Sequence, residues 1–146
     1  MSSRRVVALA VLGALAVAGT AAAKGPDRAR VCGKTTTCRV IGGDQQVYPL
    51  ISGWETAPFS ERGTPRPAPY FTIAIDSTQG EPGKWFLVWV PSTRLLRVTV
   101  SGAPPYTSRT VGPYWRSVPA AAVTTFSAAV RGLASHPAIR GWRIKG

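Results

Sequence analysis

The sequence predicts a small α+β domain, in which an antiparallel sheet of about four to six strands has one C-terminal helix packed on one face. Three segments in the middle of the chain alternate apolar and polar residues and follow one another through short links. A segment near the C-terminus instead repeats its apolar residues at helical spacing. The chain has 146 residues, which suits one domain and allows a real core.

The three alternating segments are residues 70–76, 85–90 and 95–100. A period of two is the pattern of a β-strand with one buried face. The second segment is apolar at every position, which indicates a central strand buried on both faces. Because the links are short, the order predicts an antiparallel meander. The expected buried positions are Phe71, Ile73, Ile75, Leu96, Val98 and Val100, with Phe86, Val88 and Val90 on one side of the central strand and Trp85, Leu87 and Trp89 on the other.

The predicted helix runs from Ser117 to about Ala134. Ser117 suits the N-cap, and Pro119 suits the first turn, where a missing N–H is tolerated. Apolar residues at helical spacing form one face, which we expect to lie on the sheet. These residues are Val118, Ala122, Phe126, Ala129, Val130 and Leu133.

Turn residues at 42–44 separate two short apolar stretches ahead of the first alternating segment. Residues 38–41 and 46–51 are therefore predicted to form the strands of a hairpin. Residues 24–30 are polar and charged, so we expect a flexible lead-in to a single globular domain of residues 31–146.

Two long segments break both the helical and the strand pattern. Residues 52–69 carry four prolines, and residues 101–116 again mix glycine and proline with aromatic residues. We expect both to be loops of the kind that often carry function. The tail 139–146 is expected either to add an edge strand or to dock through Trp142.

The first 23 residues have the three parts of a secretory signal peptide. Arg4 and Arg5 precede the apolar run Val6–Ala18, and small residues end at Ala23. We predict cleavage after Ala23, and hence a secreted or envelope-associated protein. The alternative is an uncleaved membrane anchor, because residues 6–23 are just long enough to span a bilayer. The paired arginines leave both general and twin-arginine export open.

The chain is strongly basic, with a formal charge of +12. Residues 1–23 hold two of the 18 basic residues and none of the six acidic ones, so the remainder keeps 16 basic residues and carries +10. The basic residues are spread out, without the run that marks a nucleic-acid-binding tail. We therefore expect a monomer that associates with an anionic envelope polymer, lipid headgroups or an acidic protein, without specific nucleic-acid binding.

Residues 31–40, VCGKTTTCRV, combine the end of a phosphate-binding loop with two cysteines. The full phosphate-loop motif requires a glycine at position 28, but this position is Arg28. The motif must also follow a buried strand, whereas residues 27–30 are mostly charged. We therefore expect no nucleotide binding here. Cys32 and Cys38 are the only cysteines, and in an exported chain we expect them to form a disulfide. Their spacing is not that of a thiol-redox motif.

The sequence contains no recognisable catalytic or metal-binding pattern. His136 is the only histidine, and no G-x-S-x-G motif is present. A structural zinc site needs four nitrogen or sulfur ligands, so we expect no metal and no cofactor, with His136 at the surface or the helix end. Glu55, Glu61, Asp76 and Glu81 leave a carboxylate-based hydrolase open.

The five tryptophans lead to the hypothesis of a ligand-binding platform. Trp85 and Trp89 should project from one sheet face, and Arg97 on the neighbouring strand could face the same way. Indoles beside an arginine can stack on sugars or bases and bind phosphates. The candidate ligand-binding residues are therefore Trp85, Trp89 and Arg97, with Trp54 and Trp115. The alternative, favoured by the doubly apolar strand, is that these tryptophans belong to the core.

Together these features favour a small exported binding or accessory protein without enzymatic activity, whose basic surface associates with anionic envelope components. Two alternatives stay open: a small secreted hydrolase that uses loop carboxylates, and a secreted enzyme inhibitor that presents residues 52–69. Nothing in the sequence specifies the ligand.

Overall fold

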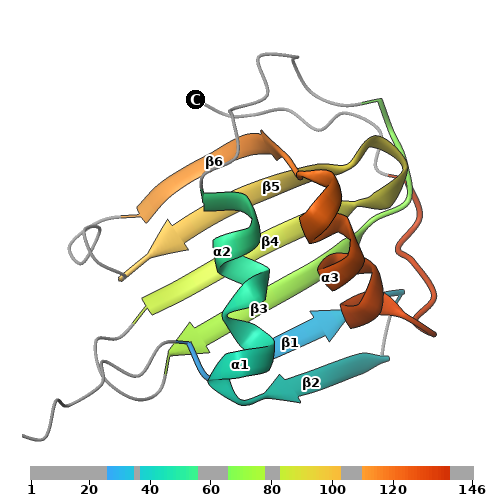
Figure 1. Ribbon diagram of the computed structural model, residues 1–146. Coiled ribbons are helices and arrows are strands. Elements are labelled where there is room, and N and C mark those ends of the chain that lie inside the picture. Colours follow the sequence, from blue (N-terminus) through green and yellow to red (C-terminus); the bar gives the residue numbers. More distant parts are fainter. Residues whose placement is uncertain (1–25, 35–36, 56–65, 78–82, 103–109, 139–146) are drawn as a thin grey trace, which may run out of the picture.

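The computed structural model describes residues 26–34, 37–55, 66–77, 83–102 and 110–138 (Figure 1). These residues form a six-stranded antiparallel sheet with helices on one face, which confirms the predicted α+β class. The strands are β1 (Arg28–Cys32), β2 (Cys38–Gly42), β3 (Phe71–Ser77), β4 (Gly83–Val90), β5 (Leu95–Ser101) and β6 (Thr110–Ser117). The helices are α1 (Asp44–Val47), α2 (Pro49–Glu55) and α3 (Ala120–Val130), with a 3-10 turn, η1 (Pro91–Thr93), between β4 and β5.

The strand order is β2-β1-β3-β4-β5-β6, and every neighbouring pair is antiparallel. The predicted meander is confirmed as β3, β4 and β5, with η1 as the short link between the last two. The hairpin of β1 and β2 extends the sheet beyond β3. The sheet therefore has two edge strands among the described residues, β2 and β6.

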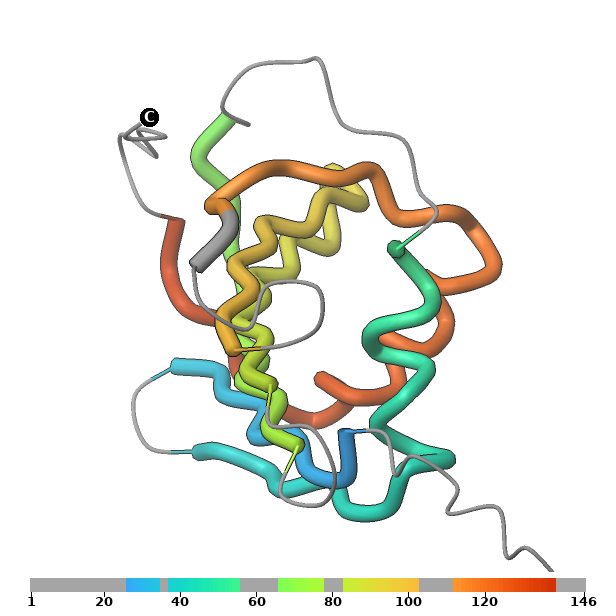
Figure 2. Tube along the Cα trace, turned by 90° about the vertical axis from the view of Figure 1, so that its left-hand side faces the viewer, coloured from blue at the N-terminus to red at the C-terminus, as the bar shows by residue number. Residues whose placement is uncertain are grey.

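The helices lie on one side of the sheet, as the edge-on view in Figure 2 shows. The core forms between this helical layer and the sheet, and Trp89 and Phe126, its two largest fully buried side chains, stack with ring centroids 5.1 Å apart. The predicted face of the C-terminal helix is confirmed, because Ala122, Phe126 and Ala129 are buried there. The helix is shorter than predicted at both ends. It begins after Pro119, because β6 continues to Ser117, and it ends at Val130 and not near Ala134.

The prediction of a strand at residues 46–51 is wrong, because this segment is helical and divided between α1 and α2. Val47, Leu50, Ile51 and Trp54 are all buried. Val47 ends α1, and Leu50, Ile51 and Trp54 lie at helical spacing on one face of α2. All four side chains belong to the core. Tertiary packing thus overrides the β-type reading of this short run.

Two further expectations are corrected. Arg28–Arg30 do not belong to a lead-in but to β1, which is paired on both sides by β2 and β3. Of the predicted loop at residues 101–116, residues 110–116 belong to β6, and Ser117, the predicted N-cap of the helix, is the last residue of this strand. A strand that contains Gly112 and Pro113 is tolerated there because β6 is an edge strand with a register shift against β5.

The chain after α3 returns to the end of the sheet, between β1 and β3. The backbone N–H of Lys34 donates to the Ala134 carbonyl at 2.7 Å, and His136 forms an antiparallel bridge with Tyr70. A Cβ atom on Gly33 would collide with the Ala134 carbonyl oxygen, so this approach requires glycine. The predicted docking of residues 139–146 lies outside the described residues.

Candidate functional site

The sheet has two unequal faces. Side chains alternate along a strand, and directly paired residues share a face. The face turned away from α2 and α3, called the open face below, carries Arg28, Arg30 and Cys32 of β1, Cys38 and Val40 of β2, Thr72, Ala74 and Asp76 of β3, Lys84, Phe86, Val88 and Val90 of β4, Leu95, Arg97, Thr99 and Ser101 of β5, and Trp115 and Ser117 of β6. None of the described helices covers it (Figure 2).

Four cations lie on the open face, with Asp76 as the one carboxylate among the described residues there. Arg28 and Lys84 are exposed and lie directly across from Asp76 on its two neighbouring strands. Arg30 is exposed on β1, and Arg97 is half-buried on β5. The described part of this face therefore has a surplus of positive charge.

Phe86 stands at the centre of these cations with 46% of its surface exposed. The residues directly across from it are small, Ala74 on β3 and Thr99 on β5. Lys84 is two positions along the same strand, roughly 7 Å away, and Arg97 is a diagonal neighbour on β5, at roughly 7–8 Å. An accessible aromatic ring thus has cations along its strand and on the next one.

The other end of the open face is apolar and closed. Val88, Val90 and Trp115 are almost fully buried there. Arg97 lies directly across from Val88 on one side and from Trp115 on the other. Arg97 therefore lies beside buried apolar residues, whereas Phe86 keeps an accessible ring.

Three of the predicted tryptophans belong to the core between the sheet and the helices or pack against it. Trp89 is fully buried, Trp54 is 3% exposed and donates its indole N–H to the Leu50 carbonyl at 2.8 Å, and Trp85 is half-buried against the same core. The expectation that Arg97 faces the same way as Trp85 and Trp89 is wrong. Trp85 lies directly across from Val100, which is buried on the helix-covered face. Arg97 is three residues before Val100 on the same strand and therefore projects from the opposite face.

Of the five predicted ligand-binding residues, only Arg97 and Trp115 are brought together on the open face. Phe86, the exposed aromatic residue of this face, was expected in the core because the whole segment 85–90 is apolar. The one sequence signal for its exposure is Lys84, which shares its face two residues away.

Arg116, by contrast, has a structural position on the helix-covered side. Its guanidinium donates to the carbonyl of Glu55, the last residue of α2, at 3.1 Å. The same group lies 5.6 Å from the ring centre of Trp54 and 5.4 Å from that of Tyr114. A cation at a helix C-terminus is favourable both as a hydrogen-bond donor and through the helix dipole.

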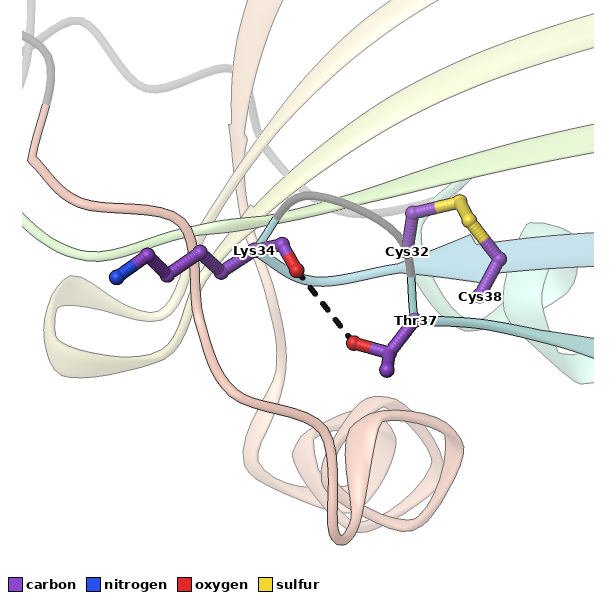
Figure 3. The surroundings of a disulfide bond; sticks show 4 residues. All are labelled: Cys32, Lys34, Thr37 and Cys38. Carbon is purple, nitrogen blue, oxygen red and sulfur yellow. Dashed lines mark hydrogen bonds between the residues drawn. A yellow bond between two sulfur atoms is a disulfide. The ribbon is translucent and has the colours of Figure 1, made fainter.

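The predicted disulfide between Cys32 and Cys38 is confirmed (Figure 3). It joins directly opposite residues of β1 and β2. The side chain of Lys34 points away from the disulfide, and the Thr37 hydroxyl donates to the Lys34 carbonyl at 3.4 Å. The disulfide therefore closes the turn between the first two strands.

The remaining candidates for chemistry are not assembled into a site. Among the described residues, no group of three or more His, Cys, Asp or Glu side chains could hold a metal ion. Glu55 ends α2 on the helical side, whereas Asp76 lies on the open face, and Glu61 and Glu81 lie outside the described residues. His136 is half-buried and stacked on Tyr70 at 4.7 Å, so it is a packing residue and not a free surface group.

The chain matches no family model, and no curated protein or solved structure matches it either. No helix in the described part of the chain is long and apolar enough to cross a membrane. The fold and the open face together define a small α+β protein with a basic sheet surface around one exposed aromatic ring.

Proposed function

We propose that this chain is an exported, non-enzymatic protein that binds an anionic polymer of the cell envelope through the open face. The observation that carries the proposal is the exposed ring of Phe86 among Arg28, Arg30, Lys84 and Arg97. An accessory role fits the signal peptide predicted at residues 1–23 and the positive charge of the remainder.

The spread of the cations favours a polymer over a small anion. Arg30 and Arg97 lie three strands apart, a separation of roughly 14 Å at the usual strand spacing. This exceeds the screening length of about 8 Å at physiological ionic strength, so one small anion cannot interact strongly with both. A chain with repeated negative charges contacts several cations at once and gains from their combined effect.

The exposed ring favours a polymer that contains sugar rings. Phe86 rises between two small residues, so a flat ligand can reach the face of its ring without displacing a neighbouring side chain. The apolar C–H surface of a pyranose can cover such a ring, while the charged groups of the polymer meet the surrounding cations. The proposed ligand class is therefore an anionic glycopolymer, ahead of lipid headgroups or an acidic protein at this face.

The first test compares dextran sulfate with neutral dextran, which share a sugar backbone and differ in charge. Immobilised dextran sulfate should retain the protein at low salt and release it at high salt, whereas neutral dextran should retain little. The Arg28→Gln/Arg30→Gln double variant should bind dextran sulfate roughly tenfold more weakly, because two open-face contacts are removed.

The matched control is the Arg94→Gln/Arg131→Gln double variant, which removes the same charge from exposed positions outside the open face. It should weaken binding by less than about threefold. Equal losses in the two double variants would mean that net charge alone drives retention, and the proposed surface would be wrong. Phe86→Ala should weaken binding roughly fivefold if the ring contacts sugar.

A further inference from the structure

The two edges of the sheet are built differently. At β6, Pro113 lacks a backbone N–H, and the register against β5 shifts between Val98 and Val100. Both features are common devices that prevent further strand pairing. At the other edge, β2 contains no proline, and no described strand pairs with its outer side. Of the two edges, β2 is therefore the one that can accept another strand.

Register identifies the backbone groups that this edge offers. In an antiparallel pair, hydrogen-bonded and non-hydrogen-bonded residue pairs alternate, and the latter have the shorter Cα separation. Cys32 and Cys38 are 4.1 Å apart at Cα, which marks a non-hydrogen-bonded pair, whereas Gly43 donates to the Asp27 carbonyl at 2.9 Å. By this alternation, the N–H and C=O of Val40 point away from β1. The Val40 side chain is 54% exposed.

A groove of about 350 Å³ lies along the helical side of this edge. It runs between β2 and the helices α1, α2 and α3, whose positions are seen in Figure 1. Its apolar wall combines side chains from the strand and the helices, and Arg39 supplies its positive charge. The Arg39 guanidinium is fixed by a 2.8 Å hydrogen bond to the Arg131 carbonyl. Its lining includes Arg39, Ile41, Leu50, Ala128 and Ala129.

We propose that β2 and this groove bind an extended peptide segment of an acidic partner protein, which adds to the sheet as a further strand. Backbone hydrogen bonds to Val40 would supply affinity, and alternate side chains of the peptide would enter the groove. One aliphatic side chain fits against Ile41, Leu50 and Ala129, and a carboxylate two residues away fits Arg39. The groove lies on the helical side of the sheet, opposite the cations of the open face, and the proposal does not depend on the function proposed there.

Charge complementarity selects this occupant over a second copy of the chain. Pairing two β2 strands would bring the Arg39 residues of two chains onto one face of the joined sheet, and residues 24–146 of each chain carry 16 basic and six acidic residues, a net +10. Like charges across neighbouring strands destabilise the pairing. An acidic segment reverses the sign of this interaction and uses the positive charge that the edge presents.

The test uses a fluorescein-labelled peptide, Thr-Thr-Glu-Thr-Leu-Thr-Glu-Thr, which places leucine and a glutamate on one face in either chain direction. Fluorescence anisotropy should show binding, and amide NMR shifts should change along β2 and α3. Val40→Pro should weaken binding roughly tenfold or more, because it removes an outward N–H that the sheet does not use. Val40→Ala keeps that N–H and should bind nearly as the unaltered chain does.

The groove is tested independently by Ala128→Leu, which adds an aliphatic group to an exposed helix position that lines it. This variant should also weaken peptide binding roughly tenfold. Ala121→Leu makes the same change at another exposed position of α3, outside this groove, and should leave binding unchanged. Because the leucine variants do not alter β2, they decide the question even if Val40→Pro unfolds the chain.

Three results would overturn the proposal. The first is peptide binding that is unaffected by both Val40→Pro and Ala128→Leu. The second is equal binding of a peptide in which lysine replaces both glutamates. The third is concentration-dependent dimerisation that Val40→Pro abolishes, without any peptide binding, which would assign the edge to a second copy. Dextran sulfate should not displace the peptide. Peptide binding that persists in its presence would show that the two ligands occupy different sites.

Discussion

Neighbouring residues of β4 lie on opposite faces of the sheet and differ strongly in exposure. Leu87 and Trp89 are fully buried beneath the helices, whereas Phe86, on the open face, keeps 46% of its surface exposed. All three residues are large and apolar, and they differ in what lies above them. An apolar residue beneath a helical layer contributes to stability, whereas one on an uncovered sheet is available for contact with a ligand.

The test with the largest expected effect compares alanine substitutions at two aromatic residues of β4. Trp89→Ala should lower the free energy of unfolding by about 3–5 kcal/mol, because it leaves a cavity beneath Phe126. Phe86→Ala should lower it by less than about 1 kcal/mol, because its ring is nearly half exposed already. Urea unfolding followed by circular dichroism measures both values.

Equal losses for the two aromatic variants would show that the open face is covered and would remove the basis for a ligand there. An intermediate loss at Phe86, together with unchanged dextran sulfate binding, would assign the ring to packing.

A second test addresses the part of the sheet with the least burial. Residues of β2 are exposed or half-buried, so the disulfide to β1 supplies stability that packing does not. The Cys32→Ser/Cys38→Ser variant should lose about 2 kcal/mol of unfolding free energy. Hydrogen exchange should accelerate in β2 more than in β4, and uniform acceleration across the sheet would contradict this local role.

The smallest expected effect compares two arginines on opposite sides of the sheet. Arg116→Gln should cost about 1 kcal/mol of stability, because the helix C-terminus of α2 loses a charged donor. Arg30→Gln, at an exposed position of the open face, should leave stability nearly unchanged and weaken dextran sulfate binding. Thermal unfolding measures the stability of each variant, and affinity chromatography measures its binding to dextran sulfate. Lower stability in Arg30→Gln together with weaker binding in Arg116→Gln would contradict the roles assigned to the two faces.

Strong periodicity made part of the fold predictable. The alternation at residues 70–76 and 95–100 identified β3 and β5 with their buried faces, and helical spacing identified the face of α3. Periodicity failed where a segment was short or carried a breaker. Residues 46–51 are interrupted by Pro49, and β6 contains Gly112 and Pro113.

The candidate surface was less predictable than the fold. Alternation showed that Trp85 and Trp89 share a face, but the register between β4 and β5 decided that Arg97 lies on the other one. The exposure of Phe86 could not be read from an apolar run, because such a run does not state which side the helices cover.

By itself, the sequence determined the class of fold, the strand and helix faces with a clear period, the disulfide between the only two cysteines and the positive charge. These properties depend on local order along the chain. Only the tertiary structure decided that β1 joins the sheet, that α1 and α2 replace a strand, and that one face and one edge stay accessible. Those outcomes depend on pairing and covering between distant segments, and the hydrophobic effect that drives them is non-directional.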